Sequence, residues 1–213
     1  MRDCYIVGLT GGSGSGKSEA ARILAGFGAA HINVDKEARV VMDEPDALIA
    51  LERELGSLVI GDDGKFARKR VADIAFRDKN FLSILTRISH AFITRRILDI
   101  LDDITKKNPG SVIVIDAPIP IERGFLDKTD EVWVMKADYD IRLNRIITRD
   151  GIGEEEAITR INAQLSDYEY EKLADIVILN NGAYAELKEK LSIIWENTLT
   201  RHIDHGNNVG NNV

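Results

Sequence analysis

Apolar residues gather in five short runs along the chain, and these runs are rich in β-branched side chains. They are Tyr5 to Leu9, His31 to Val34, Ser111 to Ile115, Glu131 to Met135 and Asp175 to Leu179. Short runs of this kind, set apart by turn residues, are typical of buried strands. We therefore expect a sheet of five buried strands.

The stretches between these runs carry apolar residues at helical spacing. The first predicted helix covers Lys17 to Phe27, and Gly28 is its expected terminator. The other predicted helices lie between Pro45 and Gly56, from the N-cap Asp138 through Arg149, from Glu154-Glu155-Glu156 onward, and over Tyr184 to Thr198. One longer helix, ended by Asn108-Pro109-Gly110, has an inner stripe formed by Phe81, Leu85, Ile88, Phe92, Ile97, Leu101 and Ile104.

Strands that alternate with helices predict an α/β fold with a five-stranded parallel sheet in a three-layer α/β/α arrangement. The segment between the second and third strands, Asp35 to Gly110, is too long for one crossover and is mostly helical in pattern. We expect one domain over residues 1–200, with a core of 1–36 and 110–200 and a helical insertion at about 37–109. Residues 201–213 are polar and repetitive, and we expect a disordered tail there.

Composition narrows the class of protein. The chain has 213 residues, of which 44% are hydrophobic and 30% charged, so it is expected to fold. Its net charge of -7 argues against a general nucleic-acid binder, and no apolar stretch is long enough for a membrane span. The single cysteine, Cys4, fits a reducing compartment. We expect a cytoplasmic protein with no nucleic-acid or membrane partner.

A glycine-rich loop between the first strand and the first helix carries the strongest chemical signal. Residues 11–18, Gly-Gly-Ser-Gly-Ser-Gly-Lys-Ser, satisfy the pattern G-x-x-x-x-G-K-[ST] in its required context. Small residues let backbone N–H groups converge on phosphate oxygens at the positive end of a helix. The alternative is a merely flexible loop. The motif predicts a P-loop NTPase fold and the cofactors ATP and Mg²⁺, bound by Gly11, Gly12, Ser13, Gly14, Ser15, Gly16, Lys17, Ser18 and Glu19.

Within this loop, Lys17 is expected to act on the β- and γ-phosphates and the Ser18 hydroxyl to bind Mg²⁺. Asp116 ends the third strand after an apolar run, as a Walker B carboxylate does, and is the second predicted metal ligand. Asp35 follows the second strand, at the sheet edge where ligands bind, and could accept a proton from a substrate hydroxyl or help to hold Mg²⁺. The alternatives are a turn former at Asp116 and a helix N-cap at Asp35.

Two arginines four residues apart, Arg145 and Arg149, share one face of a predicted helix. Guanidinium groups placed in this way could close over the phosphates and stabilise the charge that develops during transfer. The alternative is that they pair with acidic neighbours on the surface. The first interpretation makes them catalytic residues, together with Lys17 and Asp35.

The ordered set of motifs resembles the dephospho-CoA kinase family from about residue 5 to 195. The residues that carry the resemblance are the P-loop, Asp35 with Arg39, Asp63-Gly64 before Arg68, His90, Pro118 with Glu122, Arg145, Arg149-Asp150-Gly151, Arg160, Gln164, Ala174-Asp175 and Asn180-Asn181-Gly182. The resemblance implies a kinase that transfers the γ-phosphate of ATP to the ribose 3′-hydroxyl of dephospho-coenzyme A, the last step of coenzyme A biosynthesis.

The same resemblance implies that Asp35 is the catalytic base and that residues of about 139–165 form a lid carrying Arg145 and Arg149. The helical insertion would bind the acceptor through Arg68 and His90. The other residues that the resemblance assigns to acceptor binding are Asp35, Arg39, Pro118 and Glu122. The chain departs from the family at Asn33, Ala91 and Pro120, which the family usually fills with Asp, Pro and Leu. The departure at Asn33 concerns a Mg²⁺ role of the first carboxylate, and those at Ala91 and Pro120 concern the acceptor side. The phosphate-binding loop is unchanged.

Two other functions stay open. A kinase of a nucleoside or nucleotide would share the P-loop, Asp35 and the arginines, and would differ in the insertion. A nucleotide-dependent switch is disfavoured, because Asp116-Ala117-Pro118-Ile119 lacks the glycine of Asp-x-x-Gly. We expect a monomer or a weak homo-oligomer that acts on a small molecule.

Overall fold

A computed structural model describes residues 4–117 and 128–209, and describes side chains as far as Arg201. Pro118 and Glu122, two of the predicted acceptor-binding residues, lie outside the described residues. The chain divides into two compact units, Met1–Ile32 with Ile104–Val213, and Asn33–Asp103.

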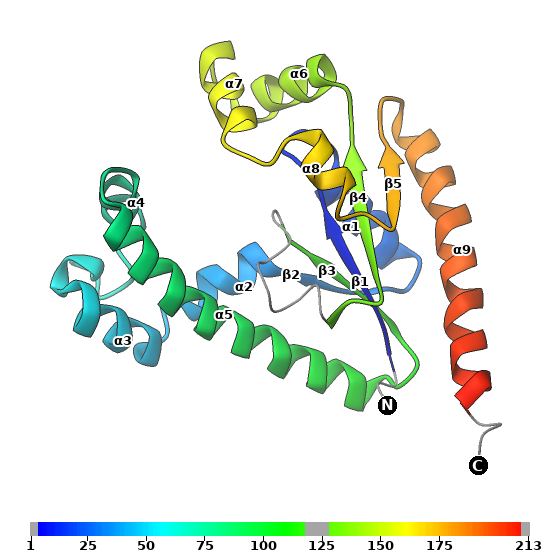
Figure 1. Cartoon of the computed structure of the whole chain (residues 1–213), viewed down its shortest axis with the longest axis horizontal. Coiled ribbons are helices and arrows are strands. Elements are labelled where there is room, and N and C mark those ends of the chain that lie inside the picture. The colour runs from blue at the N-terminus through cyan, green and yellow to red at the C-terminus, as the bar shows by residue number, and fades with distance from the viewer. Residues whose placement is uncertain (1–3, 118–127, 210–213) are drawn as a thin grey trace. The chain divides into compact units, whose positions relative to one another are not determined.

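The first unit is built on a parallel sheet, which confirms the predicted fold class. Its strands are β1 (Tyr5–Thr10), β2 (Ala30–Asn33), β3 (Val112–Asp116), β4 (Glu131–Lys136) and β5 (Ile176–Leu179), in the order β2-β3-β1-β4-β5 (Figure 1). The β1/β3 and β1/β4 pairs are parallel, and Leu9 lies opposite both Asp116 and Trp133. The carboxyl ends of these three strands therefore meet at one edge of the sheet.

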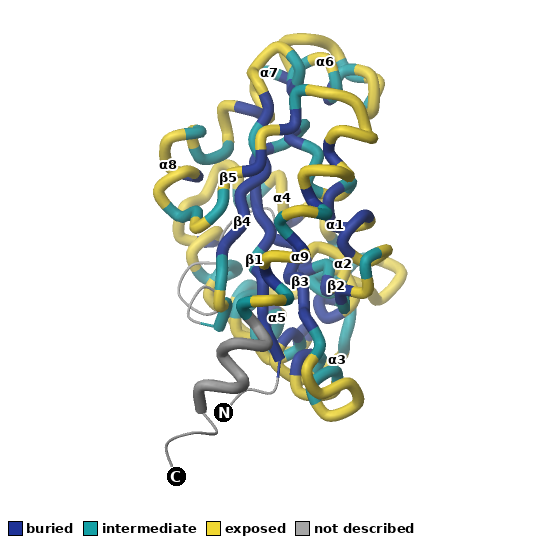
Figure 2. The backbone as a smooth tube through the Cα atoms, turned by 90° about the vertical axis from the view of Figure 1, so that its right-hand side faces the viewer, coloured by how far each residue is buried: buried dark blue, intermediate teal, exposed yellow. Residues whose placement is uncertain are grey.

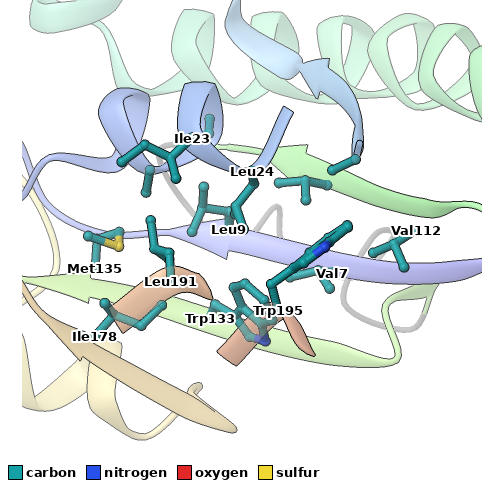
Figure 3. Packing of buried hydrophobic residues seen from close by; sticks show 14 of the residues in the cluster. Val7, Leu9, Ile23, Leu24, Val112, Trp133, Met135, Ile178, Leu191 and Trp195 are labelled. Carbon is teal, nitrogen blue, oxygen red and sulfur yellow. The ribbon is translucent and has the colours of Figure 1, made fainter. Parts of the chain in front are cut away.

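Five helices of the described chain accompany this sheet: α1 (Lys17–Gly26), α6 (Tyr139–Asp150), α7 (Glu154–Asn162), α8 (Asp167–Glu171) and α9 (Tyr184–Val209). The α1 and α9 helices pack against each other and bury Leu24 and Trp195 in the main core, with Leu9 and Trp133 of the sheet (Figure 3). The strands β1, β3 and β4 are buried along most of their length (Figure 2). The α6 and α7 helices form a pair beyond the carboxyl end of β4 (Figure 1).

The second unit is helical and has a core of its own. It contains α2 (Val34–Val41), α3 (Pro45–Leu55), the 3₁₀ turn η1 (Ser57–Val59), α4 (Arg68–Arg77) and most of α5 (Lys79–Lys107). Its core is formed by Val41, Met42, Ala47, Leu51, Val59, Val71, Phe81 and Ile88. The predicted helix between Pro45 and Gly56 and the long helix before Asn108 are confirmed.

The structure differs from the sequence-based predictions at three other places. Val34 begins α2 and does not end the second strand. The short helix α8 was not predicted; it begins with a capping box in which Ser166 and Glu169 exchange hydrogen bonds. The last helix was expected to end at Thr198 and continues to Val209. Thr198 is buried and Arg201 pairs with Glu131 at 2.7 Å, so the helix stays in contact with the core unit as far as Arg201.

No helix within residues 4–117 and 128–209 has the length and apolar character required to cross a membrane.

Glu131 joins three elements at the amino end of the sheet. Its carboxylate accepts a hydrogen bond from Trp133 Nε1 at 2.8 Å and pairs with Arg201 of α9. Tyr5 of β1 is 7% exposed and also bonds Glu131. Burial, and then the nearby charge of Glu131, raise the pKa of Tyr5 to about 12, from its usual value of 10.0.

Tyr5 should therefore make the unfolding free energy fall at alkaline pH. The folded protein holds the phenol proton up to about pH 12, whereas the unfolded chain releases it near pH 10. The contribution of Tyr5 is complete below pH 10 and is lost between pH 10 and 12, at up to about 1.4 kcal/mol per pH unit.

Urea unfolding followed by circular dichroism at pH 9, 10 and 11 measures this loss. Tyr5→Phe should show a shallower decline than the unaltered chain over this range. Tyr184→Phe is the matched control, because Tyr184 is 56% exposed. If Tyr5→Phe and the unaltered chain declined with the same slope, Tyr5 would have no such role.

Candidate active site

The glycine-rich loop joins β1 to α1 in a backbone conformation that demands glycine at three positions. Gly11, Gly14 and Gly16 have φ angles of 143°, 79° and 93°, which L-residues with side chains rarely adopt. A Cβ atom at Gly14 would collide with the backbone of Arg142, and one at Gly16 with the side-chain amide of Asn180. The small residues of the motif thus fit closely against other parts of the same unit.

The loop leaves a row of unused hydrogen-bond donors at the start of α1. Among the described residues, the backbone N–H groups of Gly14, Gly16, Lys17 and Ser18 have no partner. The N-cap residue, Gly16, offers no side chain to bond them. Because a helix N-terminus also carries partial positive charge, these donors fit a phosphate group.

Asp116 lies at the end of β3, where it is only 1% exposed. Lys17 Nζ donates a hydrogen bond to Asp116 Oδ1, and His31 Nε2 lies 3.4 Å from Asp116 Oδ2. Burial by itself would raise the pKa of Asp116, but the hydrogen bond from His31 and the charge of Lys17 together hold it below its usual range. The site therefore contains a carboxylate that stays ionised at neutral pH, with a lysine next to it.

The predicted metal ligands Ser18 and Asp116 belong to adjacent elements of this unit. Ser18 is exposed in the first turn of α1. Within the described ranges there is no cluster of three or more His, Cys, Asp or Glu side chains able to hold a metal. One hydroxyl and one carboxylate suit Mg²⁺ in the form in which nucleotides carry it, with most ligands supplied by phosphates and water.

Side chains that follow β4 in the sequence donate hydrogen bonds to the backbone carbonyl groups of the loop. Arg142 Nε donates to Ser13 O at 2.9 Å, and Arg145 donates from one Nη to Gly14 O at 3.2 Å. Asn180 Nδ2 donates to Ser15 O at 2.9 Å in a buried contact. Three successive carbonyls of the loop therefore each have an external donor.

One backbone N–H group of the loop also donates to a side chain from a distant part of the sequence. Gln164 accepts a hydrogen bond from Ser13 N through Oε1 at 2.6 Å. Gln164 and Asn180 belong to the motifs that resemble the family, but their role was not predicted. Arg142 was missed altogether. Its only signal in the sequence is its place three residues before Arg145, which would put both on one helix face.

The two predicted lid arginines differ in their contacts. Arg145 also donates to Asn180 O at 3.0 Å, so it links the loop to the segment after β5. Arg149 is 62% exposed and makes two hydrogen bonds to its neighbour Asp150, at 2.7 and 2.8 Å. The structure thus brings Arg145 to the P-loop and places Arg149 in the surface pairing that was the alternative. Glu19 similarly pairs with Arg22 on the surface of α1.

The second unit contains four of the predicted acceptor residues: Asp35, Arg39, Arg68 and His90. Asp35 lies exposed in the first turn of α2. The interpretation of Asp35 as the N-cap is wrong, because Asn33 is the cap and its side chain accepts a hydrogen bond from Lys36 N at 2.8 Å. The Asp35 carboxylate is therefore not used to begin the helix.

Arg39 and Arg68 come together, whereas His90 lies half-buried on α5. Arg68 donates to the Arg39 carbonyl at 2.6 Å and forms an ion pair with Asp43 at 2.8 Å. The hydrogen bond from Arg68 is the main cause that holds the pKa of Asp43 below its usual range. No pattern in the sequence indicated Asp43, since only the fold brings it to Arg68.

Comparison with known proteins agrees with this geometry. A family model described as dephospho-CoA kinase matches residues 5–186. The dephospho-CoA kinase of Thermobifida fusca is 35% identical over 191 residues, which cover 89% of this chain and 94% of that relative.

Solved structures agree as well. A Thermus thermophilus protein matches with a TM-score of 0.76 at 26% identity, covering 91% of this chain and 97% of that one. The dephospho-CoA kinase from Campylobacter jejuni matches with a TM-score of 0.69 at 25% identity, covering 94% and 98%. The resemblance seen in the sequence is confirmed, and the chain belongs to the dephospho-CoA kinase family.

Proposed function

We propose that this protein transfers the γ-phosphate of ATP to the ribose 3′-hydroxyl of dephospho-CoA and releases coenzyme A and ADP. One observation carries the phosphate-transfer part of this proposal: the row of unpartnered amides at the start of α1, beside Lys17 and the ionised Asp116. Membership of the dephospho-CoA kinase family supports the identity of the acceptor.

The loop and Lys17 would bind the triphosphate. The free N–H groups of Gly14, Gly16, Lys17 and Ser18 can each donate to a phosphate oxygen, and Gly11, Gly12, Ser13, Ser15 and Glu19 complete the predicted nucleotide site. The Lys17 ammonium is held by Asp116, and we propose that it exchanges this contact for the β- and γ-phosphates. Little covalent chemistry is left to the protein, because positioning and charge stabilisation account for most of phosphoryl transfer.

Ser18 and Asp116 are the proposed residues that hold Mg²⁺. The lowered pKa of Asp116 keeps its carboxylate available as a ligand at neutral pH. Bound Mg²⁺ would neutralise charge on the phosphate oxygens. Arg145 and Arg149 are proposed to stabilise the charge that develops on the transferred group.

The second unit would supply most of the residues that bind the acceptor. We propose that Asp35 takes or directs the proton of the attacking hydroxyl, and its exposed carboxylate is free of the capping role that Asn33 fills. Arg39, Arg68, His90, Pro118 and Glu122 are the proposed contacts to the remainder of the acceptor. The Arg68 guanidinium, fixed by Asp43 and the Arg39 carbonyl, is suited to bind an anionic group.

For its setting, we propose a cytoplasmic enzyme that works as a monomer or a weak homo-oligomer, with a small molecule as its substrate and without a nucleic-acid or membrane partner. The net charge of -7 supports the absence of a nucleic-acid partner, because a polyanion requires a basic surface.

The acceptor is tested by ADP release in the presence of ATP and Mg²⁺, with dephospho-CoA, adenosine, uridine or AMP offered one at a time. Dephospho-CoA alone should stimulate turnover strongly, and the product should carry the new phosphate on the ribose 3′-oxygen. Stimulation by AMP or a nucleoside instead would support the kinase of another small acceptor. Slow hydrolysis that ignores every acceptor would contradict both kinases.

Replacing Asp35 by Asn should separate chemistry from nucleotide binding. We expect Asp35→Asn to lower kcat by about 10²-fold or more, because the amide cannot accept the hydroxyl proton, while the Kd of ATP changes little. Asp73→Asn is the control, since Asp73 is an exposed carboxylate on α4 of the same unit. A turnover number in Asp35→Asn equal to that of the unaltered enzyme would remove Asp35 from the chemistry.

Lys17→Ala should weaken both ATP binding and turnover, because it removes the cation for the phosphates. It also leaves the buried Asp116 without its lysine, so part of the effect could come from lost stability. The double variant Lys17→Ala/Asp116→Asn removes the buried negative charge as well and should recover thermal stability without recovering turnover. Unchanged ATP affinity in a folded Lys17→Ala protein would contradict the proposed phosphate site.

A further inference from the structure

Arg142 on α6 is a buried charge that the proposed reaction does not yet use. Its exposed fraction is 5%, although arginine is charged at any physiological pH and is rarely buried without a partner. It lies in the same unit as the P-loop and was not part of the motifs that indicated a kinase. A buried guanidinium in this place requires a reason.

The contacts of Arg142 fall on the loop and on α8. Its Nε donates to Ser13 O at 2.9 Å, and one Nη donates to Asp167 Oδ1 at 2.8 Å. A Cβ atom at Gly12 would collide with the guanidinium group. The glycine at position 12 therefore makes room for Arg142, in addition to any space that the loop leaves for phosphate.

Peptide geometry connects the Ser13 carbonyl to an amide of the phosphate site. In a trans peptide the C=O of one residue and the N–H of the next point in opposite directions. Because Arg142 holds Ser13 O, the N–H of Gly14 points away from the Arg142 side chain. This N–H is one of the donors that have no partner in the described part of the chain.

We propose that Arg142 is a positioning residue for nucleotide binding: it fixes the Ser13–Gly14 peptide so that the Gly14 N–H is aimed at a phosphate oxygen before the nucleotide arrives. The inference rests on the nucleotide part of the proposed function and does not depend on which acceptor is used. Asp167 fixes the other side of the guanidinium, so the segment at the start of α8 supports the same peptide.

A contribution to the stability of the fold does not by itself explain why Arg142 is buried here. Among the residues that the structure describes, its second Nη has no partner, and the Ser15 hydroxyl, which lines the same small pocket, has none either. Unsatisfied buried polar groups lower stability, and apolar residues of similar volume often replace a buried ion pair without loss. A charged group that is kept at such a cost to the fold is typical of a functional position.

The test is nucleotide binding to the full chain, measured by titration calorimetry with ADP and with a non-hydrolysable ATP analogue. Arg142→Gln should raise both Kd values by about 10-fold or more, since a small misplacement of a binding group can cost up to about 10²-fold. The KM of dephospho-CoA should change by less than about 3-fold. The Kd values of Arg142→Lys should lie between those of the unaltered chain and those of Arg142→Gln. Lysine can donate a hydrogen bond to Ser13 O but lacks the planar fork that also reaches Asp167.

Further variants are provided by Asp167, which is the ion-pair partner of Arg142, and by the exposed Arg53. Asp167→Ala should weaken nucleotide binding in the same direction, and its effect should not add to that of Arg142→Gln, because both act on one guanidinium. Arg53→Gln is the control for charge: Arg53 is 76% exposed and pairs only with Glu54 on α3 among the described residues. It should leave both Kd values unchanged.

Two outcomes would overturn the role of Arg142. One is that folded Arg142→Gln and Arg142→Lys proteins bind ADP as the unaltered chain does. The other is that the melting temperature falls while the Kd per folded molecule stays the same, which would make Arg142 structural only. If the unaltered chain bound ADP normally but did not phosphorylate dephospho-CoA, the proposed acceptor would fail and the inference on Arg142 would stand.

Discussion

The carboxylate of Asp116 sets the strongest constraint on the core unit. A charge with almost no solvent contact must be compensated by the protein, and Lys17 and His31 supply the compensation. Lys17 begins α1, His31 belongs to β2, and Asp116 ends β3. The loop between β1 and α1 must therefore place Lys17 close to the end of β3, and this requirement fixes the loop at the carboxyl edge of the sheet.

Much of the fold could be predicted from the sequence because it depends on local patterns. The apolar runs marked all five strands to within one or two residues, and the Gly-Lys-Ser motif located the turn into α1. The failures have a tertiary cause. The continuation of α9 past Thr198 includes the contact of Arg201 with Glu131, which lies 70 residues earlier in the chain, and no local signal at Thr198 reveals that contact.

The site was predictable only in part for the same reason. The phosphate-binding residues are contiguous, so their spacing identifies them, whereas the side chains that hold the loop come from 129 to 165 residues away. Arg142, Gln164 and Asn180 become meaningful only when β4 and β5 bring their following segments to the loop. At Asp35 the competing N-cap interpretation failed because Asn33, two residues earlier, is also an effective cap.

The two tryptophans of the chain, Trp133 and Trp195, both belong to the core shared by β4, α1 and α9, and the helical unit Asn33–Asp103 contains neither (Figure 3). Tryptophan fluorescence therefore reports on the core unit alone, and the helical unit contributes no tryptophan signal. Comparison of that signal with one that follows all helices would reveal whether the two units melt as a single cooperative block or in separate steps.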